Sequence, residues 1–174
     1  MAFTQYVYGK QEPVTRNRYI GVLAVDPGGS TGYVWGVFDL DARTLKNCLA
    51  GAYWESGTIT GSEIDQAKAL CAIWKKLKDQ PTSSVYRFVI EDYIQQPTMH
   101  VVDPESLMPI RVAWATIGMM EERFGALAPR PDFQTPGTRM PEQRLKIHDA
   151  WIRGRVHERA AMGHMLAFLS QRLR

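Results

Sequence analysis

The sequence predicts an α/β domain in which a five-stranded mixed sheet, made of an antiparallel meander and parallel crossovers, is flanked by helices. Three observations lead to this prediction. Three extended apolar stretches joined by short connections come first, and they favour an antiparallel meander. Extended and helical stretches then alternate, which favours parallel crossovers within the same sheet. The chain has 174 residues, 45% of them hydrophobic and 22% charged, so one domain can bury a core without disulfides or a structural metal.

The predicted meander occupies residues 19–29, 33–40 and 47–59, after a polar extension over residues 1–18. Its first strand, YIGVLAVDPGG, is a β-branched apolar run that ends in Pro and Gly, as a strand entering a tight turn does. The second, YVWGVFDL, alternates, and the third, NCLAGAYWESGTI, follows a turn of mixed charges. These three stretches account for three of the five strands.

A helix is predicted over residues 62–79, because Ser62 and Asp65 form a capping pair and apolar residues recur at helical spacing up to Pro81. The fourth strand, VYRFVIEDYI, covers residues 85–94 and has little polarity before Glu91, as expected for a strand covered on both faces.

The remaining elements are another helix, a short strand and two closing helices. The helix has Pro109 near its start, and Gly154 separates the closing helices. Their predicted ranges are 105–124, 130–136, 139–151 and 157–173. The single domain is therefore expected to span residues 19–174.

Charge and cysteine content narrow the class of protein. The net charge is +3, but residues 139–174 carry eight Lys or Arg against three acids, which permits a polyanion partner without requiring one. Cys48 and Cys71 are interpreted as reduced, partly buried apolar residues of a cytosolic protein. No apolar run approaches the roughly 20 residues of a membrane helix, and the first residues lack the apolar stretch of a signal peptide. We therefore expect a cytoplasmic protein and no membrane partner.

Two acidic residues end apolar strands, and each has an ordinary structural interpretation beside a functional one. Asp26 precedes PGGSTG, a loop whose glycines let a backbone approach a phosphate or metal; it also suits the cap of a tight turn. Glu91 ends the run RFVI and also suits a structural ion pair. Two carboxylates brought close together repel unless a cation or a shared proton lies between them. The pair therefore indicates a site that holds a cation or a shared proton.

The last helix supplies a third candidate, His157. Residues His157, Ala160, Ala161 and His164 share one face, whereas Glu158 points about 100° away from His157. A histidine at a helix start is often a solvated or capping residue. Here the small alanines let its face lie close to the sheet edge where the two carboxylates are expected.

Four segments of the sequence resemble the RuvC-type Holliday junction resolvases of the ribonuclease H-like superfamily, in the compact version of bacteriophages. They are LAVDPGGSTGY, FVIEDY, FQTP and the final helix beginning HERAAMGHMLAFL. The resemblance covers about residues 19–172. It implies a ribonuclease H-like fold and a two-metal endonuclease in which Asp26 contacts both ions, Glu91 holds one, and His157 stands where the family uses Asp or His. Hard oxygen ligands favour Mg²⁺ or Mn²⁺. Paired nicking of a twofold junction implies a homodimer, and the apolar segment at 107–120 is a candidate dimer face as well as a candidate core helix.

The sequence departs from the family at one catalytic position. Such resolvases usually read His-x-x-Asp at the start of the last helix, and here Ala160 follows His157 by three residues. Three explanations remain open: an alteration that traps an inactive complex, a naturally weak enzyme, or substitution by Glu158 after a local twist.

The resemblance also points to residues that contact DNA. Tyr93 suits base stacking or the core, and the loop at 95–104 suits junction contact or an ordinary surface. Gln134 lies in the family's basic context near the site, where Arg139 replaces or displaces a lysine. Arg155 and Arg159 continue this basic segment, which would give salt-sensitive phosphate affinity.

Other functions remain open beside a junction resolvase. A junction-binding protein that has lost catalysis through Ala160 is one, and a nuclease acting on other branched DNA or on RNA/DNA hybrids is another, because the same metal chemistry serves them all. Sugar kinases and actin-like ATPases also combine an acidic strand with a Gly-rich loop, but they need two such domains, and 174 residues hold one.

Overall fold

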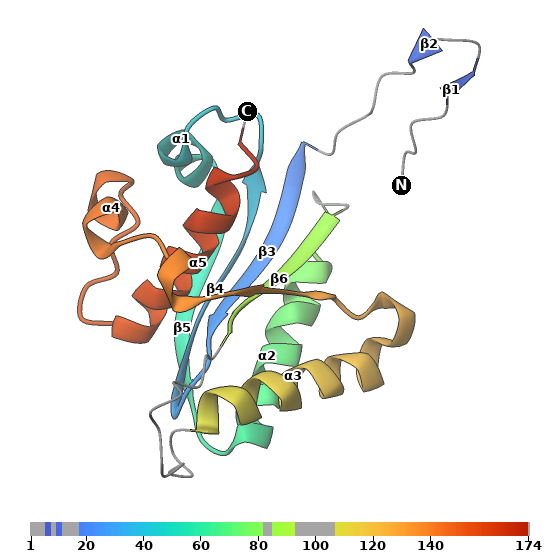
Figure 1. The fold of residues 1–174 in the computed structure, drawn as a ribbon, viewed down its shortest axis with the longest axis vertical. Coiled ribbons are helices and arrows are strands. Elements are labelled where there is room, and N and C mark those ends of the chain that lie inside the picture. The colour runs from blue at the N-terminus through green and yellow to red at the C-terminus, as the bar shows by residue number, and fades with distance from the viewer. Residues whose placement is uncertain (1–5, 8–9, 12–17, 82–84, 93–106, 174) are drawn as a thin grey trace.

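A five-stranded mixed sheet forms the centre of the molecule (Figure 1). The computed structural model describes residues 6–7, 10–11, 18–81, 85–92 and 107–173. In spatial order the strands of the sheet are β5 (Tyr53–Thr60), β4 (Ser30–Asp39), β3 (Tyr19–Asp26), β6 (Val85–Glu91) and β7 (Pro131–Gln134). Strands β3, β4 and β5 form an antiparallel meander, and β6 and β7 continue the sheet in parallel with β3.

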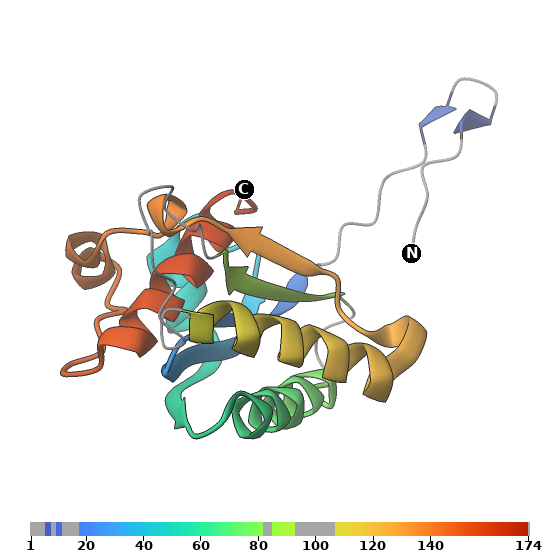
Figure 2. The ribbon, with the colours of Figure 1, turned by 60° about the horizontal axis from the view of Figure 1, so that its bottom comes forward.

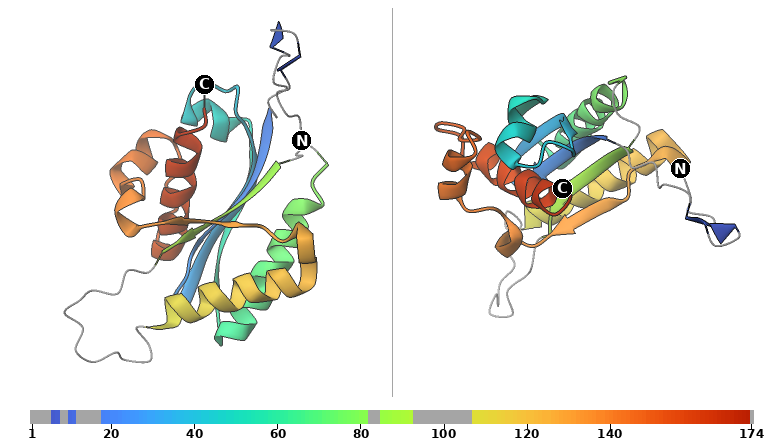
Figure 3. Two further views of the ribbon diagram at one scale, coloured as in Figure 1. Left: turned by 45° about the vertical axis from the view of Figure 1, so that its right-hand side comes forward. Right: turned by 90° about the horizontal axis from the view of Figure 1, so that it is seen from above.

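Helices cover both faces of this sheet (Figures 2 and 3). Helices α2 (Glu63–Lys78) and α3 (Met108–Phe124) pack on one face, and α5 (Val156–Ser170) crosses the other beside α1 (Leu45–Ala50) and α4 (Glu142–Ile147). Because successive strand residues point to opposite faces, β3 supplies both cores. Val22 and Ala24 join the core under α5, and Leu23 and Val25 join the core under α2 and α3.

The predicted fold class is confirmed, and the main strands and helices follow the predicted order, with α1 as an added helix. The sequence predicted residues 47–50 as the start of the third strand, but in the structure these residues belong to helix α1. The reason is local: the Thr44 side chain accepts a hydrogen bond from the Asn47 amide and caps the helix, and Leu45, Cys48 and Leu49 are buried on one side of it. The third strand therefore begins at Tyr53.

The remaining elements differ from expectation only at their ends. Ser62 caps α2 by accepting from the Asp65 amide, as its sequence predicts. Pro109 lies in the first turn of α3, where its missing N–H leaves no bond unmade. The fourth strand ends at Glu91 and the last strand at Gln134, with short 3-10 turns η2 (Gly125–Leu127) and η3 (Pro136–Thr138) on either side of β7.

A two-stranded sheet is separate from the central sheet. The two-residue strands β1 (Tyr6–Val7) and β2 (Lys10–Gln11) pair with each other antiparallel. None of the described helices has the length and apolar character that crossing a membrane requires.

Candidate functional site

The first site residue, Asp26, ends β3 in a row of side chains that crosses three strands. Asp26 pairs with Gly32 of β4, and Gly32 pairs with Thr58 of β5. Residues paired in this way project from the same face of a sheet. Asp26 and Thr58 therefore lie on either side of a glycine, on the face that α5 covers.

Gly32 lets the start of α5 lie directly on the sheet. A Cβ atom at position 32 would come within 2.2 Å of the carbonyl carbon and oxygen of His157 and within 2.7 Å of the Glu158 amide nitrogen. The absent side chain is thus what admits the first turn of α5. This contact brings His157 beside Asp26, and its Nδ1 lies 3.1 Å from Asp26 Oδ2.

The second carboxylate, Glu91, ends β6, which pairs in parallel with β3. The register that pairs Ala24 with Val89 puts Glu91 on the same sheet face as Asp26. The Nε2 atom of His164, one of the histidines predicted to share the His157 face, lies 2.5 Å from Glu91 Oε2. The other ring nitrogen of His164 lies 3.1 Å from Gln134 Oε1. His164 is fully buried, so it holds Glu91 from within the core.

The two carboxylates are close enough to influence each other. Burial raises the pKa of Asp26 above its ordinary value, the negative charge of Glu91 raises it further, and the hydrogen bond from His157 partly opposes both. The side chains nevertheless reach the surface, with exposed fractions of 14% for Asp26, 18% for Glu91 and 47% for His157. A cation arriving from solvent would relieve the repulsion.

The loop behind Asp26 is held by two buried polar side chains. Gln66 of α2 donates from Nε2 to the carbonyls of Gly28 and Gly29, at 3.2 and 3.4 Å. Thr31 accepts from the Gly28 amide at 3.2 Å. The PGG turn is therefore tied to α2, which limits the freedom of the strand end that carries Asp26.

These residues have the donor chemistry of a divalent-cation site. Carboxylate oxygens are ordinary ligands for Mg²⁺ or Mn²⁺, and the mutual repulsion of the two carboxylates favours a positive ion. Within the residues that the structure describes, however, no group of three or more His, Cys, Asp or Glu side chains is gathered closely enough to hold a metal ion.

Ala160 and Glu158 lie in the same helix but in different surroundings. Ala160 is buried, with an exposed fraction of 6%, and offers no ligand atom. Glu158 turns towards β5, where Ser56 and Thr58 donate to its carboxylate. It has partners of its own on the side of α5 away from Glu91.

The predicted DNA contacts differ in whether they lie within the described residues and in how exposed they are. Tyr93 and the loop at 95–104 lie outside the described residues. Gln134 is buried and bonded to His164. Arg139 is exposed, with its aliphatic part over Gly163 of α5.

The two arginines at the start of α5 differ in exposure. The Arg155 side chain is 59% exposed and contacts Glu158 through Nη1 at 3.0 Å. The Arg159 side chain is 11% exposed, bonds Glu142 and the Ile152 carbonyl, and stacks on Trp151. Little of its guanidinium is therefore accessible to a phosphate.

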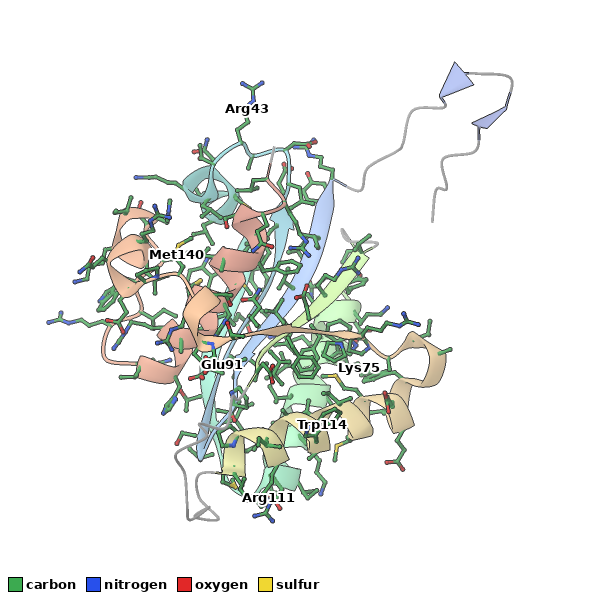
Figure 4. The ribbon with its side chains drawn as sticks, viewed as in Figure 1. Arg43, Lys75, Glu91, Arg111, Trp114 and Met140 are labelled. Carbon is green, nitrogen blue, oxygen red and sulfur yellow. The ribbon has the colours of Figure 1, made fainter. Side chains whose placement is uncertain are left out.

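Two features near the site escape prediction from sequence. The spacing of seven residues from His157 places His164 on the correct helix face, but it does not assign His164 to Glu91. A cleft of about 330 Å³ also lies beside Glu91 and Asp92, between α3 and β7. Its wall includes Trp114 and Phe133, whose ring centroids are 6.2 Å apart; Figure 4 shows Trp114 on α3. Helical periodicity identifies the buried face of α3, but it does not show that β7 lies beside the exposed face, so the sequence does not predict this cleft.

The strand order and the helices on both faces of the sheet give a RuvC-like fold of the ribonuclease H-like type. No protein-family model and no curated protein matches the chain. Among solved structures, RuvC of T. thermophilus in complex with a Holliday junction substrate is similar, with a TM-score of 0.59 and 10% sequence identity over 88% of this chain and 95% of that one. A second structure of Thermus thermophilus RuvC gives a TM-score of 0.57 at 9% identity, over 87% of this chain and 95% of that one.

Proposed function

We propose that this chain is a divalent-metal-dependent endonuclease that binds four-way (Holliday) junctions and resolves them by paired nicking. The observation that carries the proposal is that Asp26 and Glu91 end neighbouring strands on the same face of the sheet, where the His157 ring contacts Asp26 and the charge of Glu91 acts on Asp26. The RuvC-like fold supports it, and the similar protein from T. thermophilus was solved with a Holliday junction substrate. Because a fold by itself does not specify a reaction, the side chains carry the argument.

Asp26, Glu91 and His157 would hold the metal, with Mg²⁺ or Mn²⁺ as the ion and two ions per site in a complete centre. When bound, divalent ions supply Lewis-acid activation of water and of the scissile phosphate. The protein's part is to hold its ligands in position. The Nδ1 contact with Asp26 orients the His157 ring, so Nε2 would be the nitrogen offered to an ion. His164 engages Oε2 of Glu91, so Oε1 is the oxygen that a cation would meet.

Branched DNA is the proposed partner. Arg139 and Arg155 are exposed near α5, and such residues supply phosphate affinity without sequence preference. A four-way junction has twofold symmetry, so paired nicking calls for a homodimer. The exposed apolar side chains of Trp114 and Phe133, with exposed fractions of 61% and 43%, offer a surface on α3 and β7 for that contact.

The test uses a labelled four-way junction and a linear duplex of the same sequence. In EDTA the chain is expected to bind the junction more tightly than the duplex, and added Mg²⁺ or Mn²⁺ should produce symmetric paired nicks. Asp26→Asn is the matched control, and it should bind the junction without cutting it. Equal affinity for duplex would contradict junction recognition, and nicks that persist in Asp26→Asn would contradict the assignment of the site. Flap and RNA/DNA hybrid substrates in the same assay distinguish a nuclease of wider range.

One observation favours a second candidate, a junction-binding protein without catalysis. Ala160 removes a carboxylate at the position where the resolvases that this sequence resembles carry Asp. Junction binding without nicks at any Mg²⁺ or Mn²⁺ concentration would support this alternative. Metal-dependent nicking gained by Ala160→Asp would then identify the missing ligand as the cause, and an inactive variant that still binds the junction would exclude that cause.

A further inference from the structure

Glu158 is a buried carboxylate with no part in the proposed metal site. Its side chain is 1% exposed although it lies in the first turn of α5. Ser56 Oγ donates to Oε2 at 2.6 Å, and Thr58 Oγ1 donates to Oε1 at 3.1 Å. Arg155 Nη1 contacts both oxygens, at 3.0 and 3.2 Å. Both oxygens are therefore bonded, as a buried carboxylate requires.

The position of Glu158 on the sheet connects it to the site. The peptide that joins His157 to Glu158 lies on Gly32, where a Cβ would meet the His157 carbonyl and the Glu158 amide. From this peptide the two side chains diverge to the strands on either side of β4. His157 reaches Asp26 of β3, and Glu158 reaches Thr58 of β5, in the same row of paired residues.

These contacts leave the first turn of α5 little freedom to rotate. The helix begins at Val156, and its N-cap, Arg155, makes no side-chain capping bond. The anchor that usually fixes a helix start is therefore missing. Glu158 replaces it from inside the helix, where its charge also suits the positive end of the helix dipole. If the helix turned about its axis, it would break the Glu158 contacts and the His157 contact together.

Stability alone does not account for a charge in this place. An ion pair whose arginine is 59% exposed contributes little to stability, whereas a buried, hydrogen-bonded charge can impose one register on the parts that it joins. Here the parts are the strand β5 and the helix turn that carries His157.

We propose that Glu158, held by Ser56 and Thr58 of β5, is a positioning residue that fixes the His157 imidazole against Asp26. The inference deepens the proposed function, since it concerns the same site, but the geometry that it describes is measurable without nuclease activity.

The test compares Glu158→Ala and Glu158→Gln with the wild-type chain. Glutamine keeps an acceptor oxygen for Ser56 or Thr58, so it should rescue most of what alanine loses. Long-range ¹H–¹⁵N spectra of the histidine rings report the tautomer of His157, and calorimetric titration with Mn²⁺ reports metal affinity. In Glu158→Ala we expect the His157 ring to lose the single tautomer that its Nδ1 contact with Asp26 selects. We also expect the Mn²⁺ affinity to fall about 10- to 100-fold, as it does when a residue that orients a metal ligand is removed.

Glu142→Gln is the matched control. Glu142 also pairs with an arginine of α5, Arg159, at 3.1 Å, but it is 55% exposed and lies away from the row that contains Asp26. It should leave the His157 spectrum and the Mn²⁺ affinity unchanged. All spectra are recorded well below the melting temperature of each variant.

The outcomes separate positioning from a structural role and from the proposed function. If Glu158→Ala melts at a lower temperature but keeps the wild-type His157 spectrum and Mn²⁺ affinity, Glu158 is structural only and the inference is overturned. If the wild-type chain binds neither Mn²⁺ nor junction DNA, the proposed function fails, and the His157 spectrum still decides whether Glu158 positions the ring.

Discussion

Replacing Gly32 by alanine should disturb both the fold and the site, because backbone atoms occupy the space that the new methyl group needs. The Cβ atom would lie 2.2 Å from two atoms of the His157 carbonyl, and ordinary contacts begin at 3.4 Å. The new methyl group would therefore be about 1.2 Å too close, and the atoms that it meets belong to the backbone, so no side chain can move aside to make room. Either β4 bends away or the start of α5 rises by more than about 1 Å.

The size of the effect follows from this geometry. Overpacking by one methyl group against fixed atoms costs about 1–3 kcal/mol. For a domain of this length, each kcal/mol lowers the melting temperature by about 2–4 °C, so Gly32→Ala should melt about 2–12 °C below the wild type. A rise of about 1 Å also takes His157 Nδ1 out of hydrogen-bonding range of Asp26 Oδ2, from which it is now 3.1 Å away. Metal-dependent activity should fall with it.

Thermal unfolding followed by circular dichroism, together with the His157 ring spectrum, measures both consequences. Gly29→Ala is the control, because Gly29 is exposed in the loop that precedes Gly32 and nothing lies within 4 Å of the place that its new methyl group would take. It should change the melting temperature by no more than a surface substitution does. A Gly32→Ala protein that melts like the wild type and keeps the His157 contact would refute the claim that this glycine seats α5.

Three further predictions concern charge. Asp26→Asn should stabilise the fold at pH 7 by about 0.5–2 kcal/mol while abolishing cleavage. Burial and the charge of Glu91 raise the pKa of Asp26 in the folded state, so ionisation of Asp26 opposes folding above that pKa. Denaturant titrations should therefore show that the variant's extra stability disappears as the pH falls below the pKa of Asp in the unfolded chain, near 3.9. Ala160→Asp should melt at a lower temperature than the wild type in EDTA, because it buries a charge, and should gain more from added Mg²⁺ in a thermal shift assay; an equal Mg²⁺ shift in both proteins would contradict a ligand role for position 160. Arg155→Ala should reduce the slope of log affinity for junction DNA against log salt by about 1, and an unchanged slope would show that Arg155 contacts no phosphate.

Local patterns explain why much of the fold was predictable. The strand residues before Asp26 and before Glu91 are apolar because both strands are covered on both faces. Such a strand is recognisable in the sequence as a continuous apolar run. The capping pair at Ser62 marks the start of α2 within one residue. Helix α1 was missed because its six residues are too few to establish a period, and its Thr44 cap resembles an ordinary turn residue.

The site was predictable only in part, because its contacts join residues far apart in the chain. His164 lies 73 residues from Glu91, and Glu158 lies 102 residues from Ser56. Helical spacing places His157 and His164 on one face, but it does not say which strand each histidine meets. That depends on where α5 crosses the sheet.

By itself the sequence determined the fold class, the two strand-end acids and the histidine face of the last helix, because burial and periodicity are properties of short segments. Only the tertiary structure decided that His157 bonds Asp26, that His164 holds Glu91 and that Glu158 faces β5. The physical reason is the bare surface of Gly32: its missing side chain lets α5 rest on β4 at one point, and from that point the neighbouring side chains reach the strands on either side.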